Sequence, residues 1–169
     1  MKTLGACAIL FAAVSIGLLR LREKKRRLDC LRSLEEALRL MAGELSLRRP
    51  TMPELLCRMA EQSEGSAAGF FRCLALSMPR LGEKSFSALW TDAVRACFPE
   101  LRREEENELR KVGHLLGRFE LSQQLAGLES CRLRLRSRLE RAEDAYQREK
   151  KLTLAFPAAA GCLLILWML

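Results

Sequence analysis

The feature that most constrains this chain is its last stretch, residues 152–169, which has eighteen residues and no charged side chain. As an α-helix it rises about 27 Å, close to the roughly 30 Å thickness of the hydrocarbon core of a bilayer. Helices of soluble proteins rarely run this far without a charge, so a buried helix of a soluble protein is the weaker alternative. The stretch therefore predicts a C-terminal transmembrane helix over residues 152–169.

A second uncharged run, from Thr3 to Leu19, opens the chain and predicts a transmembrane helix over residues 3–21. The competing interpretation is a cleaved signal peptide, whose basic residues precede its apolar run. Here the basic residues follow the run, which favours an uncleaved anchor. Residues 22–151 are left as one domain between the two predicted spans.

Basic residues gather at the side of each predicted span that adjoins this domain. Lys and Arg next to a span are retained on the cytoplasmic side of the membrane. We therefore expect a two-pass protein of the cell membrane, with residues 22–151 in the cytoplasm and both termini outside it. The same side chains would lie near the headgroups of the lipid bilayer. These membrane-border residues are Arg20, Arg22, Lys24, Lys25, Arg26, Arg27, Arg148, Lys150 and Lys151.

The net charge of +8 is concentrated at this border and not in the domain. Residues 20–27 carry six basic side chains and one acidic one, whereas residues 29–151 carry 22 basic and 20 acidic ones. A nearly neutral domain with few aromatic residues has neither the charge to bind phosphates nor the rings to stack on bases. We therefore expect no nucleic-acid partner.

Apolar residues of the domain recur at three- and four-residue steps, which predicts α-helices, and no segment has the alternation of a strand. Residues 28–48 continue the first span as an amphipathic helix that ends before Pro50. Thr51 and Glu54 form a capping-box sequence at the start of the next helix, and Ser85 is positioned to begin a later one. The apolar side of residues 28–48 consists of Leu28, Leu31, Leu34, Leu38, Met41 and Leu45.

The second half of the domain ends in two predicted helices. We place the first turn of one at Pro99-Glu100 and its end at Gly117. The other starts near Leu121 and runs unbroken into the second span, with Arg132 interrupting its apolar seam. Its arginines are balanced by acidic neighbours, which indicates a solvated helix surface and not an RNA-binding arm. The arginines are Arg132, Arg134, Arg136 and Arg138, and the acids are Glu129, Glu140, Glu143 and Asp144.

We find no catalytic, metal-binding or cofactor-binding pattern in the sequence. It lacks a phosphate loop, a G-x-G-x-x-G motif and the metal and nucleophile motifs of hydrolases. The single histidine, His114, has no nucleophile beside it, and Glu104 with Glu108 is typical of the start of a helix. Seven scattered cysteines, none in a C-x-x-C pair, are typical of small apolar residues in a reducing compartment. We therefore expect no enzyme activity and no cofactor.

Two groups of short motifs give the chain a family resemblance. The first consists of Leu34-Glu-Glu-Ala-Leu38, Glu44 and Arg49-Pro-Thr-Met-Pro-Glu-Leu55, and the second of Leu116-Gly117, Glu120 and Gln123-Gln124. Together with the two predicted spans, their order resembles the stage III sporulation protein AB family of endospore-forming bacteria over essentially the full length. In that family the second motif has an Asp where this chain has Glu120.

The resemblance implies an all-α fold, a compact six-helix cytoplasmic bundle similar to the cytoplasmic domains of the inner-membrane platform protein (F subunit) of type II secretion machines. It also implies a non-enzymatic platform component, in the mother cell, of the secretion-like channel complex between mother cell and forespore. The implied partners are a cytoplasmic secretion-type ATPase, stage III sporulation protein AA, and other membrane components of the same complex. The implied partner-binding residues are Gly117, Glu120, Gln123 and Gln124.

The residues alone leave a second function open, that of a bitopic membrane regulator or sensor with a helical cytoplasmic domain and no secretion role. A rod-shaped signalling protein would show many unbroken heptads. Here proline or glycine interrupts the chain near residues 50, 65, 79, 99 and 117, which favours a compact bundle. The oligomeric state, including a homo-oligomer, is also left open.

Overall fold

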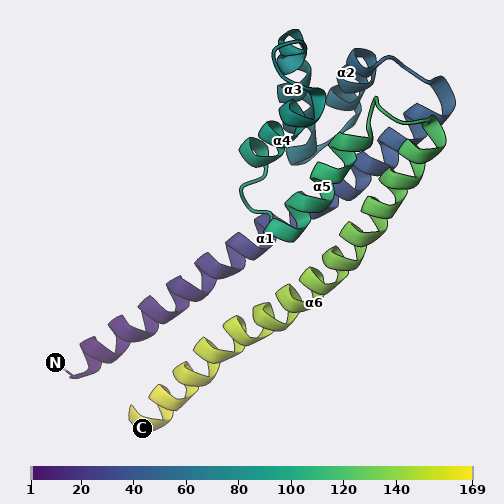
Figure 1. Cartoon of the computed structure of the whole chain (residues 1–169). Helices are drawn as coiled ribbons and strands as arrows, with labels where there is room; N and C mark the ends of the chain where they lie inside the picture. The colour runs from purple at the N-terminus through teal and green to yellow at the C-terminus, as the bar shows by residue number, and fades with distance from the viewer. Residues whose placement is uncertain (1, 169) are drawn as a thin grey trace. The chain divides into compact units, whose positions relative to one another are not determined.

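The structure is a computed structural model that describes the backbone of residues 2–168 and the side chains of residues 15–153. Within this described part it contains six α-helices, one 3-10 helix and no strand (Figure 1). The elements are α1 (Lys2–Arg48), α2 (Met52–Gln62), α3 (Gly65–Ser77), η1 (Met78–Arg80), α4 (Phe86–Cys97), α5 (Arg103–Leu115) and α6 (Leu121–Met168). The predicted all-α fold with six helices is confirmed.

The chain divides into two compact units. One unit, residues 29–139, contains the C-terminal part of α1, all of α2 to α5 and the first part of α6. The other contains residues 1–28 and 140–169, which are the outer parts of α1 and α6. Each of these two long helices is continuous, as the sequence predicts for the passage from each span into the domain.

The two predicted spans lie mostly outside the residues whose side chains are described, since these side chains begin at Ser15 and end at Thr153. Among the described residues, no helix has both the length and the apolar character that crossing a membrane requires. The spans 3–21 and 152–169 therefore stay predictions. The same holds for the boundaries of the domain between them, residues 22–151.

The core of the unit formed by residues 29–139 rests on the side of α1 that the spacing predicts to be apolar. All six residues of this side are buried, and five of them, from Leu31 to Leu45, belong to this unit. Burying a Leu or Met side chain contributes about 1.5–3 kcal/mol, so this helix face is a major source of stability. The first part of α6 adds the buried side chains of Leu128, Cys131 and Leu135.

Aromatic side chains from α3 and α4 form the centre of this core. The ring centroid of Phe70 lies 4.9 Å from that of Trp90, 5.0 Å from that of Phe71 and 5.1 Å from that of Phe98. The pairs of Phe70 with Trp90 and with Phe71 are edge-to-face, and such pairs add stability beyond the area they bury. The buried indole Nε1–H of Trp90 donates a hydrogen bond of 2.8 Å to the carbonyl oxygen of Leu109, which ties α4 to α5.

Two helix starts follow the local rules that the sequence predicts. At α2, the N–H of Thr51 donates to Oε2 of Glu54 at 2.9 Å, as one half of a capping box. At α4, the Oγ of Ser85 accepts from the N–H of Ala88 at 3.3 Å. Both predicted caps are therefore confirmed.

The start of α3 is capped by a residue from another helix. The hydroxyl of Ser33 on α1 accepts from the N–H of Ala67 at 3.0 Å and donates to the carbonyl oxygen of Glu64 at 2.6 Å. Such a cap satisfies a free N–H of the first turn, but it forms only once α1 and α3 are packed together. No local sequence rule can predict it.

The start of α5 differs from the prediction, which placed the first turn at Pro99-Glu100. The helix begins at Arg103, with Arg102 as its N-cap. The N–H of Arg102 donates to Oε2 of Glu105 at 2.8 Å, and Glu105 is fully buried. Phe98 is buried in the aromatic cluster, so the chain uses residues 99–101 to turn away from the cluster before α5 starts.

Candidate functional site

The turn between α5 and α6 contains the residues that the family resemblance assigns to partner binding. Gly117 follows α5 with a φ of +73°, a left-handed conformation that favours glycine and ends the helix. Glu120 precedes α6, and its carbonyl oxygen accepts hydrogen bonds of 3.0 Å from the N–H groups of Gln123 and Gln124. The Nε2 of Gln124 donates to the carbonyl oxygen of Phe119 at 2.7 Å. The motif thus builds the turn itself.

Most of this turn is open to solvent. Arg118 and Glu120 are exposed, whereas Leu116 is buried and fixes the end of α5 in the core. Phe119 is 49% exposed, which is unusual for an aromatic side chain. The charged side chains of Arg118 and Glu120, together with the ring of Phe119, are therefore available to a partner.

A pocket of about 210 Å³ lies beside this turn. Its walls come from the start of α2, the residue after η1, the start of α4 and the end of α5, which are far apart in the sequence. We name it the turn pocket. It is lined by Met52, Leu81, Phe86, Ser87, Gly113, Leu116, Gly117 and Arg118. Arg118 is the one charged residue of this lining, and the other walls are mainly apolar.

The turn pocket lies where two chain connections meet. A Cβ atom at Gly117 would lie 3.3 Å from the methyl carbon of Met52, so the start of α2 contacts the α5–α6 turn. The connection from α1 to α2 and the connection from α5 to α6 accordingly lie at the same end of this unit (Figure 1). Two motifs that are more than sixty residues apart in the sequence are brought together here.

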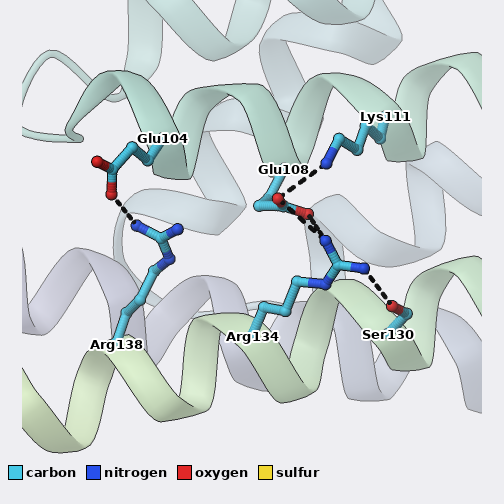
Figure 2. A network of polar contacts seen from close by, with 6 residues as sticks. All are labelled: Glu104, Glu108, Lys111, Ser130, Arg134 and Arg138. Atoms are coloured by element: carbon cyan, nitrogen blue, oxygen red, sulfur yellow. Dashed lines mark hydrogen bonds and ion pairs between the residues drawn. The ribbon is translucent and has the colours of Figure 1, made fainter.

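Ion pairs hold α5 against α6, the two helices that the turn joins. Oε2 of Glu104 accepts from Nη1 of Arg138 at 2.7 Å, and both carboxylate oxygens of Glu108 lie 3.2 Å from Nη1 of Arg134 (Figure 2). A four-residue step forward on α5 matches a four-residue step back on α6, so these helices run antiparallel. We name these contacts the α5–α6 ladder.

The electrostatics of the ladder keep both carboxylates charged. The hydrogen bond from Arg138 holds the pKa of Glu104 below its ordinary value. Burial acts to raise the pKa of Glu108, but hydrogen bonds and charge from Lys111 and Arg134 outweigh it, and that pKa is also lowered. Glu104 does lie near the start of α5, as predicted, but the role of both acids in joining two helices was not predicted.

Arg132 makes a third contact between helices. Its Nη1 donates to Oε1 of Glu35 on α1 at 2.9 Å, and its Nη2 donates to Oε1 of Glu129 at 2.6 Å. The side chains of Arg132 and Glu35 are only 19% and 18% exposed. The two carboxylates raise the pKa of the guanidinium above its ordinary value. The predicted solvated surface is therefore wrong for Arg132, because the side chain reaches from α6 across the seam to α1.

The membrane-border residues lie at or beside the unit formed by the outer parts of α1 and α6. Arg20, Arg22, Lys24, Lys25, Arg26, Arg148, Lys150 and Lys151 are exposed, and Arg27 is half-buried. Lys24 forms an ion pair with Glu149, which joins the two helices. A Cβ atom at Gly17 would lie 3.0 Å from Cγ2 of Thr153, so the helices also approach each other closely there.

Cysteine chemistry offers no reactive group at this site. The described side chains include five of the seven cysteines, all free thiols. Cys131 is buried, as expected for a small apolar residue, whereas Cys57 is exposed. Burial raises the pKa of Cys131 to about 12, and burial with contact to Cys73 raises that of Cys97 to about 11. Thiols with such pKa values stay protonated near neutral pH.

A larger pocket of about 550 Å³, lined mainly by polar residues, lies between α1 and the α2–α3 connection. Two of its polar side chains already have partners, whereas the buried Oγ of Ser63 has none among the described residues. Ser33 caps α3, and Glu36 forms an ion pair with Arg39. No three or more His, Cys, Asp or Glu side chains between Ser15 and Thr153 are grouped to hold a metal ion.

Two features of this region were missed by reasoning from the sequence. One is the close contact of Gly113 with Trp90, and a lone glycine inside a helical pattern is a signal that could have indicated it. The other is the turn pocket, whose walls come from four separate segments. No spacing within one segment can indicate such a pocket.

Comparison with known proteins agrees with the sequence resemblance. The family model described as stage III sporulation protein AB matches residues 2–169. A solved structure titled stage III sporulation protein AB superposes with a TM-score of 0.61 at 19% sequence identity, covering 74% of this chain and 97% of that chain. At this identity the superposition supports the fold alone. No curated protein sequence matches significantly. Because the family model spans nearly the whole chain, this protein belongs to the stage III sporulation protein AB family, a family of sporulation proteins.

Proposed function

We propose that this protein is a non-enzymatic, membrane-anchored platform component of the secretion-like complex that connects mother cell and forespore during endospore formation. The observation that carries the proposal is the family match over residues 2–169. The α5–α6 ladder supports the non-enzymatic part of the proposal, because its charged side chains pair with each other and join two helices. The exposed turn between α5 and α6 supplies a surface on which a second protein can dock.

Membrane anchoring is part of this proposal. The uncharged runs within residues 3–21 and 152–169 are long enough to cross a bilayer, and α1 and α6 extend over both. Eight of the nine basic residues that border these runs are exposed, which lets them lie near lipid headgroups, and one of the eight, Lys24, also pairs with Glu149. We place residues 22–151 in the cytoplasm of the mother cell and both termini outside it.

The proposed partners are the cytoplasmic secretion-type ATPase, stage III sporulation protein AA, and other membrane components of the complex. The ATPase would contact the turn formed by Gly117, Glu120, Gln123 and Gln124. Gly117 shapes this turn through its positive φ, and Gln124 does so through the hydrogen bond of its side chain to Phe119. Glu120 and Gln123 are exposed and are the two that offer side chains to the ATPase.

Replacing Glu120 by lysine is expected to weaken co-purification of the ATPase by about tenfold, which corresponds to roughly 1.4 kcal/mol. The hydrogen bonds of Glu120 within the turn use its backbone carbonyl, so the far-UV circular dichroism should not change. The control is Glu61→Lys, which reverses an exposed acid on α2 and should leave co-purification unchanged. If the two variants retain equal amounts of the ATPase, the turn does not bind it.

The proposed topology is tested with reporter fusions. Alkaline phosphatase is active only outside the cytoplasm, so fusion after Leu169 is expected to give activity and fusion within residues 60–120 to give none. The physical reason is that an Arg or Lys at mid-membrane costs roughly 2.5–3.5 kcal/mol, and the opposite orientation would translocate a whole basic cluster. Activity of the internal fusion with a silent C-terminal fusion would contradict both the topology and a cytoplasmic ATPase partner.

A further inference from the structure

We propose that the turn pocket is a socket for one large apolar side chain of a partner protein, on a segment that carries a carboxylate next to that side chain. This inference rests on the platform function proposed above, because it assigns a partner's anchor residue to the same end of the helical unit. The inference differs from that proposal in the residues that recognise the partner. The socket, and not the polar side chains of the turn motif, supplies most of the binding energy.

The size of the pocket selects this kind of occupant. Sites for small molecules and cofactors usually measure about 300–1,000 Å³, whereas this pocket has about 210 Å³. A single Leu, Met or Phe side chain suits that volume. Of the two leucines in its lining, Leu81 is 43% exposed and Leu116 is buried. An apolar group that enters would therefore replace water on side chains that the chain itself leaves partly uncovered.

Gly117 helps to keep the pocket open, and Gly113 contributes a stretch of bare backbone to its wall. Gly113 and Gly117 are four residues apart at the end of α5, and both line the pocket. The backbone of Gly113 packs directly on Trp90, and Gly117 has a positive φ, so both positions favour glycine. A Cβ atom at Gly117 would lie 3.3 Å from Met52 on the pocket wall, whereas one at Gly113 would meet Trp90, which is not part of the lining. The opening is thus a consequence of how α5 packs and ends.

The charge at the pocket specifies the flanking residue of the partner. Arg118 lines the pocket, and no carboxylate of the described residues forms an ion pair with it. A guanidinium binds a carboxylate through two parallel hydrogen bonds, which fixes orientation as well as adding energy. Arg is also among the residues enriched in interface hot spots, which lie in well-packed pockets. Glu120 favours a basic group further along the same partner segment.

The test uses the full-length chain in detergent micelles, with 13C-labelled methionine methyl groups and 15N-labelled backbone amides. The probe is an acetylated, amidated tetrapeptide, Gly-Glu-Phe-Gly. Matched peptides carry Lys in place of Glu, or Ala in place of Phe. We expect a saturable shift of the Met52 methyl signal and of the Leu81 amide signal at millimolar peptide, since one anchor gives only weak affinity. The Ala peptide should give none, and the Lys peptide should bind several-fold more weakly.

Two variants and one control complete the test. Ser87→Leu places an apolar side chain in the pocket and is expected to reduce peptide affinity at least about fivefold. Arg118→Glu changes an exposed residue, so folding should be retained, and should remove the preference for Glu over Lys in the peptide. The control Arg72→Glu makes the same charge change on the exposed surface of α3 and should bind like the unmodified protein.

Either of two results would overturn the proposal: no saturable shift of Met52 and Leu81, or equal shifts with the Phe and Ala peptides. Equal affinity of unmodified protein and Arg118→Glu for the Glu peptide would overturn the assigned flanking charge. The Glu120→Lys co-purification tests the platform function separately. A negative titration together with an ATPase that co-purifies normally would therefore reject the socket and leave the platform function standing.

Discussion

Replacing Gly113 by alanine is expected to lower the free energy of unfolding by about 2–3 kcal/mol, in the upper part of the range for overpacking a core. A Cβ atom at this position would lie 2.4 Å from Cδ1 of Trp90, 2.5 Å from its Cγ and 2.9 Å from its Cβ. The indole cannot move aside cheaply, because its Nε1 is bonded to Leu109 and its ring packs on Phe70. Thermal unfolding followed by circular dichroism would show the melting temperature falling by about 5–10 °C.

The matched control is Gly69→Ala, also inside a helix. No other atom lies within 4 Å of a Cβ built at Gly69, so the added methyl group meets open space. Alanine is favoured over glycine in a helix, and this variant is expected to gain up to about 1 kcal/mol. If both variants shift the melting temperature in the same direction, the close packing of α4 on α5 is not what determines the choice of glycine at position 113.

Replacing Arg132 by leucine is expected to lower the free energy of unfolding by about 1–3 kcal/mol. Glu35 would lose its ion-pair partner while its side chain is only 18% exposed, and breaking a fully buried pair costs about 3–5 kcal/mol. The expected loss is smaller than this because water still reaches the side chains of both Arg132 and Glu35. Urea unfolding followed by circular dichroism measures the change as a shift in the midpoint.

A second substitution distinguishes the loss of the ion pair from the effect of replacing the side chain at position 132. In the double variant Arg132→Leu with Glu35→Leu, the uncompensated carboxylate is gone, so most of the lost stability should return. The control Arg39→Leu breaks an ion pair with Glu36, in which both side chains are more than half exposed. It should change the free energy of unfolding by less than about 1 kcal/mol. Equal effects of Arg132→Leu and Arg39→Leu would show that burial adds nothing to the Arg132 contact.

The helices themselves could be predicted because the signals for them are local. The spacing of Leu28, Leu31 and Leu34 on α1 defines one apolar face, and that face is buried. Thr51 and Ser85 cap the helices that follow them, since a cap needs only the next few residues. The prediction for the start of α5 was wrong because it, too, used only local signals. Its position depends on Phe98 being held in a cluster with rings of α3 and α4, which local rules do not contain.

The partners of charged residues could not be predicted, because charge alone does not indicate distance through space. Glu104 and Glu108 lie near the start of a helix, and their pairing with Arg138 and Arg134 depends on the antiparallel packing of α5 on α6. At the candidate site, the sequence indicated Gly117 as the end of a helix. It contained no indication that Met52 and Leu81 lie beside that glycine.

The sequence by itself determined the all-α class, the apolar face of α1, two helix caps and the family, because each depends on residues read in order along the chain. The tertiary structure alone decided the cap that Ser33 makes on α3, the contact of Arg132 with Glu35 and the space at the turn pocket. Each of these joins segments that are distant in the sequence. Side-chain periodicity fixes which face of a helix is buried, whereas the neighbour it meets is fixed only when the helices pack.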